Sequence, residues 1–190
     1  MPKRVYFAFH YQDVIDFRAN VVRNHNFMQG IEKAGYYDAS IWEEAKKTSV
    51  IALKRLINKE LDYTTVTVVL IGTETFARPW VRYEILKSIE RGNFVLGIHI
   101  NSIVDKNRQT KALGPNPFDY IGLSISEDGK EATPTEWDNN KWVCYPEIDK
   151  FPVIEQPIGN RSKNLQLSNW LRTYNWISDN GYDNFSDWIE

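Results

Sequence analysis

The chain has 190 residues and a formal net charge of −2, which gives no electrostatic reason to expect nucleic acid or an anionic membrane as a partner. Hydrophobic residues make up 42% and charged residues 25%, as is typical of a single folded domain. Cys144 is the only cysteine, so no intramolecular disulfide is possible and a cytoplasmic location is expected. The apolar run Val5–Phe9 is too short for a signal peptide, and no stretch approaches the length of a transmembrane helix.

The N-terminal residues predict a buried strand followed by a helix. Val5–Phe9 is a continuous apolar run of β-forming residues, as in a buried parallel strand. Asp13 is then expected to cap a helix that reaches about Asn24. The inward stripe of this helix is expected to be Val14, Phe17, Val21 and Val22. A short strand is expected at Tyr36–Asp38.

The middle of the chain alternates between helices and strands. Ser49 to Glu60 predicts a helix, with Ile51, Leu53, Leu56 and Ile57 as its apolar positions. Val66–Ile71 is the clearest strand, and Pro79 suits the first turn of a helix that runs to about Arg91. Another strand is expected at Phe94–Ile100. This alternation is the signature of a parallel sheet with right-handed crossovers.

After Asn101 the pattern changes. Lys106–Pro117 is polar and rich in proline and glycine, so it is expected to be a loop. Tyr120–Ile125 and Lys141–Tyr145 predict two strands of an antiparallel excursion, joined by a polar stretch. The apolar spacing from Leu167 to Ile177 predicts a helix that ends near Gly181. We therefore expect one domain over residues 1–190, with a βα core at 1–104 and an extension at 105–190 packed on it.

The candidate catalytic residue is Glu84, which follows Trp80 by four residues in a W-x-x-x-E element. The helix that carries both begins just after a buried strand, and α/β sheets bind ligands at the carboxyl ends of their strands. A helical wheel places Glu84 on the shoulder of the apolar face, over Trp80, where a carboxylate is partly desolvated yet reachable from a cleft. Burial would raise its pKa and the helix N-terminus would lower it. The simpler alternative is a solvated glutamate paired with Lys87 or Ser88, beside a core tryptophan.

These residues resemble those of a known family. The stretch Val68–Ile100, with "LIGTETFARPWVRYEILKSIERGNFVLGIHI" at its heart, resembles the corresponding part of TIR-domain proteins. The opening Tyr6–Tyr11 resembles their first strand and the loop after it. Both segments are more closely similar to the TIR-like subunit of the bacterial Thoeris antiphage system.

The resemblance implies a three-layer, flavodoxin-like fold with a mainly parallel central sheet. It also implies cleavage of NAD+, as substrate and not as cofactor, at the nicotinamide–ribose bond. The ADP-ribose would be cyclised into a signal for a separate NAD-consuming effector. By position, Glu84 matches the catalytic glutamate and Trp80 the tryptophan of the motif. Phe9, His10 and Tyr11 match the first-loop positions that approach the dinucleotide, although Ala8 stands where many animal relatives have a small hydroxyl residue.

One carboxylate suits this chemistry. Nicotinamide leaves as a neutral base from a cationic pyridinium, so no general acid is required, unlike in ordinary glycoside hydrolysis, where two carboxylates usually cooperate. Positive charge then develops on the ribose, and an anionic oxygen nearby stabilises it. Trp80 or an aromatic residue from Phe9–Tyr11 is expected to stack on a planar ring. Attack by water gives linear ADP-ribose, whereas attack by a hydroxyl of the same molecule gives a cyclic product.

Other functions remain as alternatives. A TIR-type interaction module without catalysis is the main one, and a nucleoside-processing transferase would also use a glutamate. A response-regulator receiver is rejected, because the central strand ends at Ile71-Gly72 where a receiver has an aspartate. The histidines and Cys144 show no metal-ligand spacing. Asp13, Asp16 and Arg18 are candidates to line the cleft, but helix capping and surface pairing explain them adequately. Core and subdomain packing is the simplest explanation for Trp137, Trp142, Trp170, Trp176 and Trp188, with a self-association surface as the sharper alternative.

Overall fold

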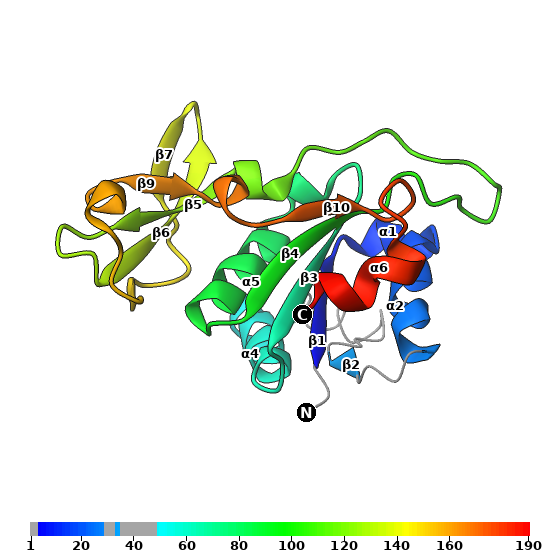
Figure 1. Cartoon of the computed structure of the whole chain (residues 1–190), viewed down its shortest axis with the longest axis horizontal. Helices are drawn as coiled ribbons and strands as arrows, with labels where there is room; N and C mark the ends of the chain where they lie inside the picture. The colour runs from blue at the N-terminus through cyan, green and yellow to red at the C-terminus, as the bar shows by residue number, and fades with distance from the viewer. Residues whose placement is uncertain (1–3, 29–32, 35–48) are drawn as a thin grey trace.

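A computed structural model describes residues 4–28, 33–34 and 49–190 (Figure 1). The central sheet has five parallel strands in the order β10-β4-β3-β1-β2. The strands are β1 (Val5–Phe9), β2 (Lys33–Ala34), β3 (Val66–Ile71), β4 (Phe94–His99) and β10 (Thr173–Asn175). The apolar runs of β1 and β3 lie in the middle of the sheet, and all six residues of β3 are buried. The predicted strand Tyr36–Asp38 lies outside the described residues.

Helices cover both faces of this sheet, which gives the expected three layers (Figure 1). On one face α4 (Val50–Leu61) and α5 (Pro79–Glu90) pack with Tyr6 and Ala8 of β1. On the other face α2 (Arg18–Met28) and α6 (Gly181–Trp188) pack with Val5 and Phe7 of the same strand. Side chains of a strand point alternately to its two faces, so each central strand contributes to both cores. No helix within residues 4–28 and 49–190 is both long and apolar enough to span a membrane.

The helices on the first face begin and end where the sequence predicts. Ser49 caps α4, and its side chain accepts a hydrogen bond of 3.1 Å from the backbone N–H of Ala52. Pro79 opens α5, where a missing N–H costs nothing. Gly92 follows α5 with a positive φ of 79°, which glycine adopts without strain. Ile51 was expected to face inward, but it is exposed, while Leu53 and Ile57 are buried.

The prediction of one helix from Asp13 to Asn24 is wrong. The segment forms two helices, α1 (Tyr11–Ile15) and α2, because Phe17 between them has a φ of 66° that breaks helical geometry. Phe17 is therefore exposed and does not belong to the inward stripe. Asp13 lies inside α1, whose N-cap is His10, so it does not cap the helix either.

The second half of the chain forms an antiparallel sheet of β7-β6-β5-β9, with β8 paired to β6. Its strands are β5 (Ile121–Ile125), β6 (Glu131–Asp138), β7 (Lys141–Cys144), β8 (Phe151–Pro152) and β9 (Asn164–Gln166). The antiparallel excursion is thus confirmed, but the polar stretch was wrongly taken as a connection. It contains β6, which lies between the two predicted strands and pairs with both.

The predicted helix from Leu167 to Ile177 is also wrong. This segment holds the short 3-10 helix η4 (Leu167–Asn169) and then β10, which pairs in parallel with the outer edge of β4. The last helix, α6, begins at Gly181 instead of ending there. Three further 3-10 turns are η1 (Thr75–Ala77), η2 (Pro117–Asp119) and η3 (Ile158–Asn160). Segment 105–190 therefore supplies both a second sheet and a strand of the first.

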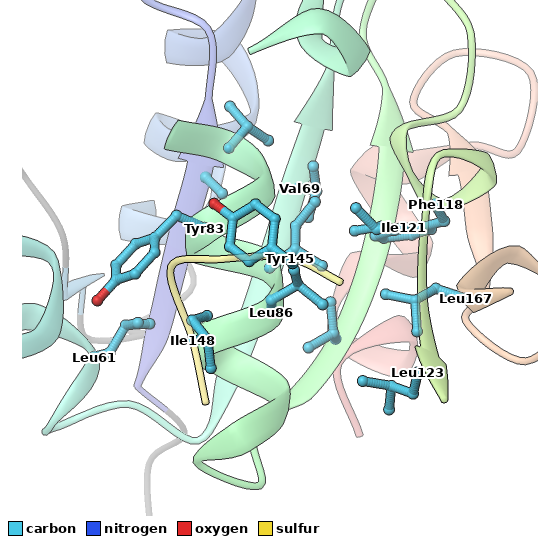
Figure 2. Close-up of a cluster of buried hydrophobic side chains, with 14 of the residues drawn as sticks. Leu61, Val69, Tyr83, Leu86, Phe118, Ile121, Leu123, Tyr145, Ile148 and Leu167 are labelled. Atoms are coloured by element: carbon cyan, nitrogen blue, oxygen red, sulfur yellow. The ribbon is translucent and has the colours of Figure 1, made fainter. Parts of the chain in front are cut away.

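One continuous core joins the two sheets across α5. Figure 2 shows Tyr145 and Ile148 beside Tyr83 and Leu86 of α5, with Ile121 and Leu123 of the second sheet further to the right. An ion pair of 2.9 Å between Arg82 and Glu136 adds a polar tie between α5 and β6.

The tryptophans divide between core and surface. Trp176 is fully buried and Trp188 nearly so, and both contact the ring of Phe185. Trp137 and Trp142 are cross-strand neighbours of β6 and β7 whose rings meet edge to face at 5.4 Å. Trp137 and Trp170 are exposed. Core packing therefore accounts for Trp176 and Trp188, and packing within the second sheet for Trp137 and Trp142.

Truncation of Trp176 should test whether the C-terminal segment belongs to the core. Trp176→Ala is expected to lower the free energy of unfolding by about 3–5 kcal/mol, because it removes a fully buried indole surrounded by aromatic rings. Ile158→Ala is the matched control, since Ile158 is exposed, and it should change stability by less than about 0.5 kcal/mol. Urea unfolding measures both, and similar midpoints for the two variants would contradict this account.

Candidate active site

Glu84 lies in the core between α5 and the central sheet. Its side chain is only 2% exposed, and the hydroxyl of Tyr6 on β1 donates a hydrogen bond of 2.5 Å to its Oε1. Its Oε2 is buried and has no hydrogen-bond partner among the residues that the structure describes. The backbone carbonyl of Glu84 accepts a bond of 2.6 Å from Ser88, whose hydroxyl also accepts one of 2.8 Å from Thr67 of β3. One turn of α5 is thus bonded to two central strands.

Burial decides the proton state of this carboxyl. It raises the pKa of Glu84 from 4.5 to about 8, and the hydrogen bond from Tyr6 opposes the shift only partly. A neutral carboxylic acid therefore stands in the core at pH 7.

The helical wheel underestimated this burial. Glu84 is not on the shoulder of α5, because its side chain meets Tyr6 in the middle of the sheet face. Neither simpler alternative for Glu84 holds, since Lys87 pairs with Glu90 and Ser88 bonds to the backbone of Glu84. Trp80 is half-buried against the same core and meets the ring of Tyr83 edge to face at 6.1 Å. Trp80 is therefore partly open to solvent one turn before the buried acid.

The three first-loop residues do not gather around Glu84. Phe9 packs on the opposite face of the sheet, where the guanidinium of Arg23 lies 5.0 Å from the centre of its ring. His10 is the N-cap of α1, and Tyr11 is the first, half-buried residue of that helix. The alternation of side chains along β1 explains the split, because Tyr6 and Ala8 face α5 while Phe7 and Phe9 face α2.

His10 instead lines a cavity of about 490 Å³ at the carboxyl ends of β1 and β3. The chain leaves β1 for β2 on one side and returns to β3 on the other, so this is the switch point of the sheet, where ligands of α/β proteins bind. Other lining residues include Gln12, Asp13, Thr73, Arg78 and Lys111. Glu84 is not among the residues that line this cavity.

Comparison with known proteins identifies the family. A family model described as "Thoeris protein ThsB, TIR-like domain" matches residues 6–105, which include Tyr6, Trp80 and Glu84. The chain is also 54% identical, over the full length of both proteins, to a Bacillus cereus (strain MSX-D12) protein named "Putative cyclic ADP-D-ribose synthase ThsB1". The chain belongs to the Thoeris ThsB TIR-like family. The resemblance drawn from the two N-terminal segments is therefore confirmed, and in this family member the W-x-x-x-E glutamate is a core residue.

Sequence reasoning missed Tyr6 and preferred the wrong interpretation of Asp13. Tyr6 is the partner of Glu84, yet it lies 78 positions away, and only the pairing of β1 with β3 brings it close. Capping was preferred for Asp13 over a place in the cleft, but Asp13 is 3% exposed and lines the cavity. Its neighbour Arg18 is not a surface residue, because it is buried and donates to the backbone carbonyls of Ile103 and Gln109. No pattern in the sequence distinguishes these side chains from surface ones.

The remaining candidates stay structural. His99 ends β4, and burial lowers the pKa of its imidazole. His25 contacts the rings of Trp176 and Tyr182 edge to face. Within residues 4–28, 33–34 and 49–190, no group of three or more His, Cys, Asp or Glu side chains could hold a metal ion.

The raised pKa of Glu84 predicts a pH dependence of stability. Between pH 6 and 8 the folded state keeps a proton that the unfolded state, with a pKa near 4.5, has already released. Stability of the wild type should therefore fall as pH rises, by about 2–3 kcal/mol over these two units. Glu84→Gln cannot titrate and should flatten this slope.

Urea unfolding at pH 6, 7 and 8 measures both slopes. Asp13, whose pKa is about 6, contributes mainly below this window and does not confuse the result. Glu90→Gln, on the same helix, is the control and should keep the wild-type slope. Parallel slopes for the wild type and Glu84→Gln would show that the carboxyl titrates normally.

Proposed function

We propose that this protein cleaves NAD+ at the nicotinamide–ribose bond and cyclises the ADP-ribose. The observation that carries the proposal is the 54% identity, from end to end, with a protein named a putative cyclic ADP-D-ribose synthase. Membership of the ThsB TIR-like family supports it, because the matched region contains the W-x-x-x-E element. NAD+ acts here as the substrate, and no cofactor is invoked.

Glu84 is the proposed catalytic residue. When nicotinamide departs, positive charge develops on the ribose, and a carboxylate in a low-dielectric site stabilises that charge far more than it would in water. The side chain exposes only 2% of its surface, so contact with substrate requires the packing around it to change. This requirement suits a signalling enzyme that stays silent until it is triggered.

The substrate itself supplies the charge that ionises Glu84. A neutral acid with a pKa of about 8 has little effect on a developing cation, but the pyridinium of NAD+ is cationic before the bond breaks. A cation placed within about 4–6 Å lowers the pKa of a carboxyl. The carboxylate then forms only when substrate is bound, and the hydroxyl of Tyr6 holds Oε1 in place.

Fewer observations support the other proposed contacts with the substrate. Trp80, half-buried near Glu84, is the candidate to stack on the nicotinamide ring. His10 lines the neighbouring cavity, whereas Phe9 and Tyr11 would touch the dinucleotide only after local rearrangement. We further propose that the cyclic product acts on a separate NAD-consuming effector. Self-association through the exposed Trp137 and Trp170, and a cytoplasmic location, stay predictions.

A purely adhesive module explains the core less well. A buried carboxyl without an ion-pair partner reduces stability above its ordinary pKa, and packing alone gives no reason to keep it. An assembly module would gain stability from glutamine or leucine at position 84. The unpaired acid therefore favours the enzyme over the module.

Replacement of Glu84 should abolish the reaction. Glu84→Gln is nearly isosteric and removes the negative charge, so release of nicotinamide and the cyclic product are both expected to fall by at least 100-fold. The measurement is mass spectrometry of small molecules from phage-infected cells that carry the wild type or the variant.

Glu90→Gln is the control for this experiment, because Glu90 lies on the same helix but pairs with Lys87 at the surface. It should form product at the wild-type level. If Glu84→Gln also did so, Glu84 would not be the catalytic residue. If the wild type formed no product in infected cells, the interaction module would be the better account.

The pH dependence of NAD+ cleavage should follow the ionisation of Glu84. Since the carboxylate is the active form, kcat/KM for nicotinamide release should rise about tenfold per pH unit up to a pH of about 8. Tyr6→Phe removes the hydrogen bond that lowers the pKa of Glu84, so its profile should shift to higher pH. Initial rates from pH 6 to 9 test this, and a flat wild-type profile would contradict the proton state derived from burial.

A further inference from the structure

The cavity at the switch point contains a second unusual acid. Asp13 is 3% exposed and lines the cavity, and within the described part of the chain its buried Oδ2 has no hydrogen-bond partner. Its carboxylate lies directly over the backbone of Gly72 at the end of β3, where an added Cβ would overlap it. Only glycine at position 72 leaves room for the acid in this place.

The other carboxylates at this cavity are already neutralised. Glu74 pairs with Arg78, and Asp16, next to the cavity, pairs with Lys111 and with Arg18. Asp13 has no such partner among the described residues; Lys111 and Arg18 act on it only through the field of their charges. Desolvation outweighs these cations and raises the pKa of Asp13 to about 6. At pH 7 the group is an ionised acceptor with a free oxygen, which is the state that a general base needs.

Asp13 and Glu84 lie near the same edge of the sheet. Arg78 lines the cavity and immediately precedes Pro79, the first residue of α5. Glu84 is five residues further along that helix, or about 7.5 Å along its axis. A folded dinucleotide with its nicotinamide ribose at Glu84 therefore has its other end within reach of the cavity. The cations Arg78 and Lys111 lie on that path and suit a pyrophosphate.

We propose that Asp13 is the general base that accepts the proton of the attacking hydroxyl during cyclisation. This role rests on the proposed function and deepens it. The bond from the ribose carbon to nicotinamide breaks first, and its electron pair leaves with the neutral base. The hydroxyl oxygen of the substrate then forms a bond to the ribose cation. The hydroxyl proton passes to Asp13 and then to solvent through the cavity. The balance is NAD+ giving cyclic ADP-ribose, nicotinamide and one proton.

The division of work between the two acids makes the role testable. Glu84 stabilises the cation and controls bond cleavage, whereas Asp13 controls which nucleophile captures the cation. Without a base the hydroxyl is a poor nucleophile, and water takes its place to give linear ADP-ribose. Loss of Asp13 should therefore shift the product from cyclic to linear ADP-ribose.

The test compares products of the purified wild type, Asp13→Asn and Asp149→Asn with NAD+, in the presence of a filtered extract of phage-infected cells. Asp13→Asn is isosteric and removes a buried charge, so it should fold. Its ratio of cyclic to linear product should fall at least tenfold. Asp149 is exposed, and its asparagine variant should give the wild-type ratio.

A second readout separates a base from a merely structural residue. The wild-type ratio of cyclic to linear product should rise with pH through about 6, and Asp13→Asn should lose this dependence. An unchanged product ratio, or an equal loss of both products, would overturn the role of Asp13 while leaving Glu84 untouched. If the wild type released no nicotinamide, the proposed function itself would fall, and this role with it.

Discussion

The contact between Glu84 and Tyr6 is the constraint on which the candidate site depends. It places a carboxyl inside the interface between α5 and β1, where water cannot solvate a charge. The acid therefore stays neutral with a pKa of about 8, and a helix that carries a polar group packs on an apolar sheet. This arrangement reduces the stability of the fold, because Oε2 of Glu84 has no hydrogen-bond partner among the described residues and a charge on the carboxyl opposes folding. A cationic substrate offsets this cost when it binds, because its charge stabilises the ionised form of Glu84.

Two carboxyls in different surroundings can do different chemistry in one protein. Glu84 is enclosed in the core and holds its proton, while Asp13 lies at a cavity and near Lys111, so its pKa rises only to about 6. At pH 7 the first is an acid and the second is a base. The loop that bears Lys111 is held in turn by Arg18, which bonds to the carbonyls of Ile103 and Gln109. Interactions far from α5 thus set the electrostatics of the cavity.

Local patterns predicted the elements whose causes are local. The apolar run of β3, the cap at Ser49 and the proline at the start of α5 all lie where expected, because burial and capping depend on neighbouring residues. Strand β6 was missed because it contains Pro134 and several polar residues and is held by pairing with β5 and β7. The segment after Leu167 has helical spacing, but Thr173–Asn175 form a strand because they pair with the otherwise open edge of β4. In the site, the spacing of Trp80 and Glu84 indicated the right helix, but not the depth that the distant Tyr6 imposes.

The C-terminal segment is an integral part of the fold that holds the site, and not an addition to it. Without β10 the edge of β4 would expose unpaired backbone groups, which favours aggregation. Without the antiparallel sheet, Tyr83 and Leu86 of α5 would lose the side chains that enclose them, among them Tyr145, Ile148 and Ile121 (Figure 2). Glu84 itself faces the central sheet, where Tyr6 of β1 donates to its carboxyl. The second sheet therefore acts on the site by packing against the helix that carries Glu84.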